Sequence, residues 1–469
     1  MEDTKLDRPN ILFLFTDDQR FDTIAAHGNP EVSTPNLDWL VSNGTSFKNA
    51  YIMGGTDFAV CMPSRAMLMT GRTLFHLQDA GQTIPDHHVM LGEALQSDGF
   101  HCWGAGKWHN GSESYARNFN DGSDVYFGGM YDHWMVPVHR FDPSGEYPGR
   151  LTRTSAFRPS NVVEEKIADH MHSGIHSTEL FSNQVCEFIN KYESQDPFFA
   201  YVAFMAPHDP RTMPQEFLDL YDANDLTPDS NFMEAHPFDN GQLTVRDELL
   251  SSIPRKKSDT MQHIAEYYAM ISHVDHQIGL IIAALEKSGK LENTIIVFAG
   301  DNGLALGRHG LFGKQSLYEH SIHIPMIISG PGIPKNNKSE ALVYTVDLYP
   351  TLCDLVGVEI PETVVGSSLM PTISGSSDGP RDYMYFAYKD LMRSVYFDDY
   401  KLIEYNVYGN RRTQLFNIKS DPGETLNLAH KQEFELVLGR LRNKMIEGKK
   451  EYSDNLPPFN KFWDGVNLE

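Results

Sequence analysis

The chain has 469 residues, of which 41% are hydrophobic and 22% are charged, and its formal net charge at pH 7 is -24. This length is enough for one large domain with an appendage, or for two to three domains, around a sizeable core. The excess of acidic residues, 63 against 39 basic ones, argues against general binding to nucleic acids or to anionic membranes, although one pocket can still be locally positive.

The cysteines and the N-terminus exclude further classes of protein. The four cysteines, Cys61, Cys102, Cys186 and Cys353, are widely spaced and form no C-x-x-C pair. This spacing argues against a disulfide framework and a zinc cluster, and leaves a single Cys61–Cys102 bridge open. No apolar run is long enough to span a bilayer. The N-terminus lacks an apolar signal region, so the protein is either cytosolic or has lost an export signal.

The first part of the chain alternates predicted strands with predicted helices. The segment ILFLF at 11–15 is short and continuously apolar, which is typical of a parallel strand that is buried on both faces. A helix follows, with Thr34 as its N-cap and Gly44 at its end. Residues 88–100 form a second predicted helix, and the residues around Cys102 form a strand that leads into a loop.

Two long irregular segments interrupt this alternation. Residues 110–175 and 209–258 show weak periodicity, which predicts long loops of the kind that set specificity. Between them lie a predicted helix at 176–192 and a predicted strand at 198–204. Residues 267–290 then form the clearest helix, because their apolar side chains fall on one stripe.

The remaining elements define two regions. Strands at 293–303 and 324–332 and a helix at 347–357 continue the alternation. After about residue 375 the pattern changes to short antiparallel strands and one terminal helix. We therefore predict an α/β fold: residues 1–375 form a large, mostly parallel central sheet flanked by helices, and residues 376–469 form a smaller α+β subdomain with an antiparallel sheet.

Carboxylates follow two of the predicted strands. Asp17 and Asp18 come directly after the first strand, and Asp301 and Asn302 come directly after the strand at 293–303. In an open α/β sheet, ligands bind beyond the carboxyl ends of the strands. These hard oxygen donors suit Ca²⁺ or Mg²⁺. Such residues are also common in turns, but two pairs directly after buried strands favour a metal site.

Cationic side chains follow strands on the same predicted side of the sheet. Lys107 and His109 follow the strand near Cys102, His208 follows the strand at 198–204, and Lys314 comes after Asn302. One such residue alone is usually solvated surface. Four of them together suit a tetrahedral oxyanion, whose charge is spread over several oxygens.

Cys61 stands at the predicted start of a helix. Pro63 suits the first turn, where the free N–H groups favour negative charge, and Arg65 can point at the same anion. A small buried hydrophobic residue and a plain nucleophilic cysteine are the alternatives. Clustered carboxylates would oppose a thiolate, so the residues favour a thiol that is the precursor of an oxygen nucleophile.

These motifs resemble the type I sulfatases, which are formylglycine-dependent enzymes of the alkaline-phosphatase-like superfamily. The signature CMPSRAMLMTGR at 61–72 is accompanied, in the order of that family, by TDDQR, GKWH, APHDP, GDNG with HGLFGK, and DLYPTL. The resemblance covers about the first 370 residues. The segment LFNIKSDPGETLNLA is similar to the second subdomain of the same family.

The resemblance implies that a separate maturating enzyme oxidises Cys61 to Cα-formylglycine. One hydroxyl of its hydrated form would bind the metal and attack sulfur, and the other would then expel sulfate. Asp17, Asp18, Asp301 and Asn302 would ligate the metal, with the modified Cys61 completing the shell. The ion would be Ca²⁺, with Mg²⁺ as an alternative.

The resemblance also implies the roles of the cationic residues. Arg65 would steady the formylglycine, and Lys107 and Lys314 would hold sulfate oxygens. His109 would assist the formylglycine hydroxyls, and His208 would protonate the leaving oxygen.

The predicted substrate is a sulfated saccharide, in a cleft that the long loops form. Arg211 and His309 lie near the motifs and are candidate substrate-binding residues. The alternatives are a phosphonate monoester or phosphodiester hydrolase of the same superfamily, and a non-catalytic binder of sulfated glycans. By analogy with polysaccharide sulfatases, we expect a periplasmic or secreted protein.

Overall fold

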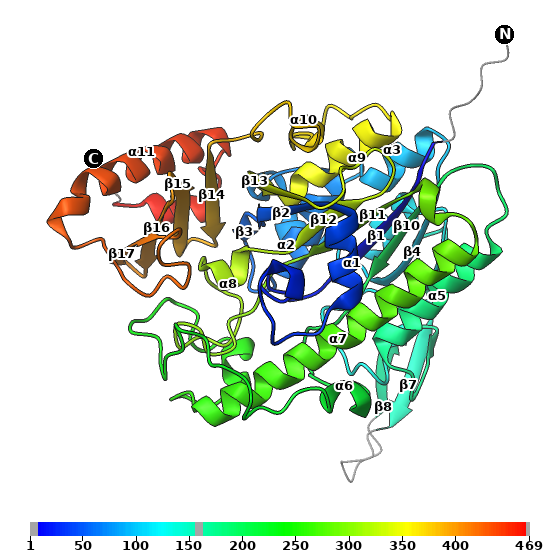
Figure 1. The fold of residues 1–469 in the computed structure, drawn as a ribbon, viewed down its shortest axis with the longest axis horizontal. Coiled ribbons are helices and arrows are strands. Elements are labelled where there is room, and N and C mark those ends of the chain that lie inside the picture. Colours follow the sequence, from blue (N-terminus) through cyan, green and yellow to red (C-terminus); the bar gives the residue numbers. More distant parts are fainter. Residues whose placement is uncertain (1–7, 155–162, 466–469) are drawn as a thin grey trace.

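The computed structural model describes residues 8–154 and 163–465 of the chain (Figure 1). In this part of the chain, a large sheet and a smaller sheet lie side by side, each covered by helices. The large sheet has eight strands, in the order β13 (Asn337–Tyr344), β2 (Gly44–Tyr51), β12 (Met326–Ser329), β11 (Thr294–Gly300), β1 (Asn10–Thr16), β10 (Phe198–Ala203), β4 (His101–Lys107) and β5 (Asp121–Tyr126).

The large sheet is mostly parallel. Strand β1 lies near its centre and pairs in parallel with β10 on one side and with β11 on the other. Strand β12 is antiparallel to both of its neighbours, β11 and β2. The predicted fold class is therefore confirmed, with one antiparallel strand inserted into the parallel sheet.

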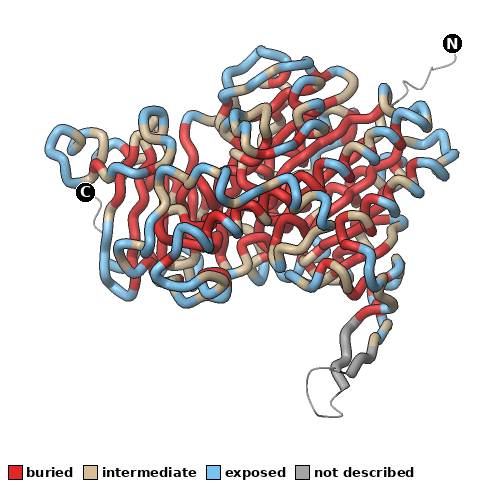
Figure 2. The backbone as a smooth tube through the Cα atoms, turned by 60° about the horizontal axis from the view of Figure 1, so that its bottom comes forward, coloured by how far each residue is buried: buried red, intermediate tan, exposed pale blue. Residues whose placement is uncertain are grey.

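Helices cover both faces of this sheet. Leu12 and Leu14 of β1 belong to the core cluster on one face, and Phe13 and Phe15 belong to the cluster on the other, as the alternation of a strand requires. The first face carries α1 (Pro35–Asn43), α5 (Ser177–Lys191) and α7 (Lys257–Lys287), and the second carries α2 (Cys61–Thr70), α3 (Leu91–Ser97) and α9 (Leu348–Val356). The strands are buried along most of their length (Figure 2).

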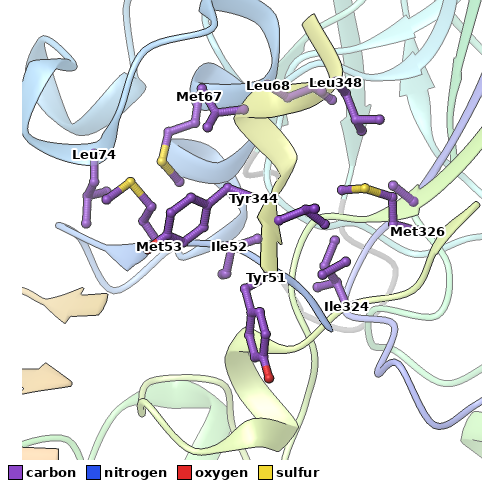
Figure 3. Packing of buried hydrophobic residues seen from close by; sticks show 14 of the residues in the cluster. Tyr51, Ile52, Met53, Met67, Leu68, Leu74, Ile324, Met326, Tyr344 and Leu348 are labelled. Atoms are coloured by element: carbon purple, nitrogen blue, oxygen red, sulfur yellow. The ribbon is translucent and has the colours of Figure 1, made fainter. Parts of the chain in front are cut away.

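Helix α2 is embedded in the second core cluster. Met67 and Leu68 of this helix lie among Met53, Tyr344 and Leu348, which come from the segment after β2, the end of β13 and the start of α9 (Figure 3). All ten residues of α2 are buried. This packing fixes the direction of the helix, so its first residue, Cys61, has a defined position.

The smaller sheet has five strands within the described residues. Four of them form an antiparallel meander, and the fifth, β3, joins from the N-terminal region and pairs in parallel with β14. These strands are β14 (Tyr383–Tyr388), β15 (Met392–Phe397), β16 (Tyr400–Val407), β17 (Asn410–Asn417) and β3 (Gly54–Gly55), and α11 (Glu435–Glu451) packs on them. One apolar cluster runs through both sheets, so the division at residue 376 stays a prediction.

The segment 110–175 contains more regular structure than its weak periodicity predicts. It holds helix α4 (Ser112–Asn118) and the edge strand β5, followed by two short antiparallel pairs. The elements after β5 are β6 (Pro137–Val138) with β9 (His170–Met171), and β7 (Arg150–Thr154) with β8 (Val163–Ile167). Strands of two to five residues are too short to give a clear apolar pattern.

Helix α7 begins ten residues earlier than its apolar stripe predicts, at Lys257. Its added first turns bury Thr260, and they place Met261 and Ile264 in a separate small core cluster. The remaining helices are short: α4 (Ser112–Asn118), α6 (Gln215–Leu218), α8 (Glu319–Ile322) and α10 (Met370–Ile373). Among the described residues, no helix combines the length and the apolar character that a membrane span requires.

Candidate active site

The candidate site lies at the carboxyl ends of four neighbouring strands. Strands β11, β1, β10 and β4 are adjacent in the sheet and parallel. The backbone N–H of Asp301 donates to the carbonyl of Thr16 at 3.0 Å, and that of Asp17 donates to the carbonyl of Ala206 at 3.2 Å. The strand exits that the sequence singled out are therefore side by side.

Three carboxylates and one amide meet below this edge. Asp17, Asp18, Asp301 and Asn302 are all at most 1% exposed. The backbone N–H of Asp18 donates to Oδ1 of Asp301 at 3.0 Å, and Nδ2 of Asn302 donates to Oδ1 of Asp18 at 2.7 Å. Oδ1 of Asp17 and Oδ1 of Asn302 are buried without a hydrogen-bond partner.

Such a concentration of buried carboxylates requires positive charge. Burial and the charge of Asp17 raise the pKa of Asp301 to about 7. Burial also acts to raise the pKa of Asp17, but Lys107, His208 and Arg65 outweigh it and hold that pKa well below its usual value. The two unpartnered oxygens and the hard-oxygen donor set fit a Ca²⁺ or Mg²⁺ ion, which would add a positive charge between the carboxylates.

Cys61 opens helix α2 beside this cluster. Its Sγ lies within 4.8 Å of ligand atoms of Asp17 and Asp301, 3.4 Å from Nδ1 of His109 and 3.6 Å from Nζ of Lys107. Burial raises the pKa of the thiol to about 11, although Lys107 acts against this. At neutral pH the thiol is therefore protonated, which disfavours the plain nucleophilic cysteine. Cys61 and Cys102 are both free, so the bridge between them does not form.

Arg65 joins the carboxylates to strand β4. Its Nε donates to Oδ2 of Asp301 at 2.9 Å, and its Nη1 donates to the carbonyl of Lys107 at 2.9 Å. The guanidinium lies over the ring of Phe15, 5.1 Å from its centroid. The side chain is fully buried, so it holds these groups rather than meeting solvent.

Two lysines and two histidines complete the constellation. Nζ of Lys107 contacts Oδ2 of Asp17, and Nζ of Lys314 contacts Oδ1 of Asp18. Nε2 of His208 lies 3.6 Å from Oδ2 of Asp18, and its Nδ1 lies 2.9 Å from the carbonyl of Asp209. Burial, and then the charge of Lys107, lower the pKa of His109 well below its usual value, so His109 is neutral.

A cleft of about 650 Å³ opens above these groups. Cys61, His109, His208 and Lys314 line its floor. Its walls come from four segments that are distant in sequence: 57–59, 82–83, 127–130 and 245–247. The wall side chains include the apolar Phe58 and Phe127 and the polar Asp57, Gln82, Arg246 and Asp247, and Gln315 lines the cleft next to Lys314.

The structure does not bring Arg211 and His309 to this cleft. Nη1 of Arg211 lies 3.0 Å from Nδ1 of His263, and its guanidinium lies over the ring of Phe312. His309 stacks on Tyr318 with ring centroids 3.9 Å apart and lines another cavity. Neither residue is among the described residues that line the cleft. The side chain of Arg211 packs on Phe312 instead, and that of His309 packs on Tyr318.

Arg246 and Asp247 line the cleft but carried no signal in the sequence. Nη2 of Arg246 donates to Oδ1 of Asp209 at 2.9 Å and to Oδ1 of Asp247 at 2.6 Å. Nε2 of Gln315 donates to Oδ2 of Asp247 at 2.7 Å. Both residues lie in the irregular segment 209–258, where neither periodicity nor a strand end marks a position.

Comparison with known proteins identifies relatives over almost the whole chain. The family model described as Sulfatase matches residues 9–358, and that described as N-sulphoglucosamine sulphohydrolase, C-terminal, matches residues 307–451. The chain is 27% identical to an arylsulfatase from Clostridium perfringens, covering 95% of this chain and 96% of that one. It is 26% identical to an N-acetylglucosamine-6-O-sulfatase from Bacteroides thetaiotaomicron, covering 97% of this chain and 88% of that one.

Solved structures share the fold. One is a protein in complex with its substrate D-glucosamine-2-N,6-O-disulfate, with a TM-score of 0.75, 24% identity, and coverage of 96% of this chain and 99% of that one. Another is a phosphonate monoester hydrolase from Agrobacterium radiobacter, with a TM-score of 0.74, 20% identity, and coverage of 95% and 96%. At these identities the likeness shows the fold alone.

Proposed function

Because the chain belongs to the sulfatase family and is thus a sulfuric ester hydrolase, we propose that its substrate is a sulfated saccharide and that it acts through a formylglycine made from Cys61 and a bound Ca²⁺. One observation carries the proposal: Cys61 opens a buried helix between a group of carboxylates and a group of cationic side chains. A sulfate ester needs positive charge around its oxygens and a nucleophile next to them.

The residues of the site fit both a bound metal ion and a formylglycine at position 61. Asp17, Asp18, Asp301 and Asn302 would hold the Ca²⁺, with Mg²⁺ as the alternative, and the ion would supply a positive charge next to the substrate oxygens. The formylglycine would supply an oxygen nucleophile at the position of Sγ. Because the thiol itself stays protonated, an oxidised side chain suits this place better than the cysteine does.

The remaining side chains bind and orient the substrate. Lys107 and Lys314 carry ammonium groups beside Cys61 and can donate to sulfate oxygens. Arg65 holds Asp301 and the end of β4 in place, so it keeps Lys107 close to Cys61.

Two histidines of the site can move protons. His109 is neutral, and its Nδ1 faces position 61, so it can accept a proton there. When both ring nitrogens of His208 carry a proton, Nδ1 donates to the carbonyl of Asp209 and the N–H of Nε2 is directed toward the cleft and Asp18. From Nε2 a proton can pass to the leaving oxygen of the alcohol.

The cleft supports a saccharide as the alcohol part. Its volume, about 650 Å³, is within the range of pockets that enclose small ligands. Its walls combine the apolar faces of Phe58 and Phe127 with carboxylate and amide groups that can bind hydroxyls. Relatives named N-acetylglucosamine-6-O-sulfatase and ulvan-active sulfatase agree with this substrate class.

The test begins with the chemical state of residue 61. The protein is expressed with and without a formylglycine-generating enzyme, and the tryptic peptide that spans Cys61 is weighed by mass spectrometry. We expect an aldehyde in place of the thiol, and activity in proportion to it. A thiol with full sulfatase activity would refute the formylglycine.

Substrate assays then separate the remaining alternatives. Sulfated mono- and oligosaccharides are assayed in parallel with a phosphonate monoester and a phosphodiester, with Cys61→Ala as the inactive variant and Cys186→Ala as the matched control on α5. A preference for the phosphorus esters would favour the hydrolase alternative. Glycan binding without turnover by the aldehyde form would favour the binder.

A further inference from the structure

A second group of metal-binding side chains lies outside the cleft. Asp124 belongs to β5, which is the edge strand of the large sheet. His170 belongs to β9 and His172 follows two positions later, so the sequence HMH directs both imidazoles to the same side of the chain. These three residues come from two elements that are distant in sequence.

The three side chains converge on one point. Nε2 of His170 lies 2.7 Å from Oδ1 of Asp124, and Nε2 of His172 lies 3.3 Å from the same oxygen. One ligand atom from each residue lies within 4.8 Å of the other two. The imidazole rings are 5.0 Å apart and nearly perpendicular, at 87°, so they approach the carboxylate from different directions.

These distances are close to those of a zinc site. With bonds of about 2.0–2.2 Å in a tetrahedral arrangement, neighbouring ligand atoms are about 3.4 Å apart. The His172–Asp124 distance of 3.3 Å already matches this spacing. The His170–Asp124 distance of 2.7 Å is about 0.7 Å shorter than this spacing, so these two atoms would move apart by that amount when the ion binds.

Few protein groups compensate the negative charge of the Asp124 carboxylate. The residue is 2% exposed, and its Oδ2 is buried without a hydrogen-bond partner. In the part of the chain that the structure describes, its ion pairs are those with His170 and His172. A buried carboxylate between two imidazoles is stabilised when a cation replaces the protons between them.

We propose that Asp124, His170 and His172 form a binding site for a divalent transition metal ion, with Zn²⁺ as the preferred ion. Two imidazole nitrogens and one carboxylate oxygen are the donors that zinc favours, in contrast to the oxygen-rich group in the cleft. The side chains of His170 and His172 are 24% and 36% exposed, which gives the ion and one water molecule access from solvent.

Such an ion stabilises the part of the cleft wall that follows β5. Strand β5 continues through Tyr126 into residues 127–130, which line the cleft. Strand β9 pairs with β6, and His139 after β6 forms a bridge back to Val125 of β5. A metal ion between β5 and His170 joins both ends of the segment that leads from β5 to β9. Its role is therefore structural.

The test measures zinc binding to the complete chain. The protein is treated with EDTA, dialysed, supplied with excess Ca²⁺ to occupy the oxygen-rich site, and titrated with ZnCl₂ by calorimetry. Titration with CoCl₂ reports tetrahedral coordination by its visible absorption. We expect one Zn²⁺ per chain, and affinity at least about tenfold lower in His172→Ala and Asp124→Asn, because loss of even an outer partner costs that much.

His87→Gln is the matched control, because His87 is an exposed histidine outside the group. It should bind Zn²⁺ as the wild type does, and Zn²⁺ should raise the melting temperature of both proteins but not of His172→Ala. His172 is half-exposed, so its variant should fold, which circular dichroism checks. Failure of the wild type to bind Zn²⁺, or equal binding by all variants, would overturn the site and leave a hydrogen-bonded carboxylate–imidazole group.

Discussion

Arg65 illustrates how one buried side chain organises the candidate site. It stands one helical turn after Cys61 and donates both to Asp301 and to the carbonyl of Lys107. A planar guanidinium can make these bonds at once, whereas an ammonium group of similar charge has no such fork. The position of Lys107 relative to Cys61 therefore depends on the shape of Arg65 as well as on its charge.

Arg65→Lys should lower kcat about 10- to 100-fold, while the protein still folds. The charge that compensates Asp301 remains, but the link to the end of β4 is lost. Steady-state kinetics on a sulfated saccharide measure the change. Arg72→Lys is the control, because Arg72 follows the same helix and bonds only partly buried backbone carbonyls of His76 and Thr363. A kcat equal to that of the control would show that the fork is not needed.

His208→Gln separates proton donation from substrate binding. If Nε2 protonates the leaving oxygen, the loss should be about 10²- to 10⁴-fold for a saccharide sulfate, whose alcohol is a poor leaving group. The loss should be much smaller for a nitrophenyl sulfate, whose phenolate leaves without a proton. The two kcat values are compared with those of His430→Gln, which replaces an exposed histidine away from the cleft. Equal losses on both substrates would refute the role in proton donation.

At the scale of elements, helix α5 supports the loop that carries His208. His133 lies 2.7 Å from Oγ of Ser177, the first residue of α5, and 2.9 Å from the carbonyl of His208. His176 caps the same helix, since its Nδ1 accepts from the backbone N–H of Thr178 and its Nε2 lies 2.8 Å from the carbonyl of Thr212. Because Nδ1 of His176 accepts a hydrogen bond, this cap requires a neutral imidazole at His176.

This cap predicts a loss of stability in acid. Burial, and then the nearby His133, lower the pKa of His176 to about 2, whereas an unfolded histidine titrates near 6.5. Below pH 6.5 the unfolded chain therefore binds a proton that the folded chain does not bind, and stability falls as the pH is lowered. Over two pH units, this difference in proton binding changes the free energy of unfolding by about 2.7 kcal/mol.

His176→Asn should remove this contribution, because asparagine can cap the helix and does not titrate. We expect the free energy of unfolding to fall less between pH 6.5 and pH 4.5 than in the wild type, by about 2 kcal/mol. Urea unfolding at both pH values measures the difference. His87→Asn, at an exposed histidine, should behave as the wild type does. Parallel pH profiles for His176→Asn and the wild type would contradict the neutral cap.

At the scale of the whole molecule, the sequence predicts the floor of the site better than its walls. Asp17 and Asp301 stand directly after strands, Lys107 ends one and His208 lies in the loop after another, and parallel strands bring their carboxyl ends to one edge of the sheet. Arg246 does not follow a predicted strand, and its position in the cleft depends on the path of an irregular segment. Side-chain pairs between distant loops cannot be inferred from local patterns.

The same limit applies to the contact between the two sheets. Lys401 of β16 is fully buried, and its Nζ lies 2.8 Å from Oε1 of Glu319 and 2.9 Å from Oε1 of Glu424. Glu319 opens α8, five residues after Lys314, and also accepts from the hydroxyl of Tyr51 at 3.1 Å. The ion pairs of Lys401 therefore connect the smaller sheet to the segment that carries Lys314, a candidate catalytic residue.

Lys401→Met should destabilise the whole molecule by about 3–5 kcal/mol, because buried Glu424 loses its lysine and buried Glu319 keeps only the imidazole of His323. Urea unfolding measures the loss, and adding Glu424→Gln to the variant should recover part of it by removing one of the unpaired charges.

The control is Lys419→Met, which breaks an exposed pair with Asp399 at 3.1 Å and should cost less than about 1 kcal/mol. If both single variants lost the same small amount, the buried group would not join the two sheets energetically. A single cooperative transition in the weakened protein would show that the sheets still unfold together, as their shared core implies.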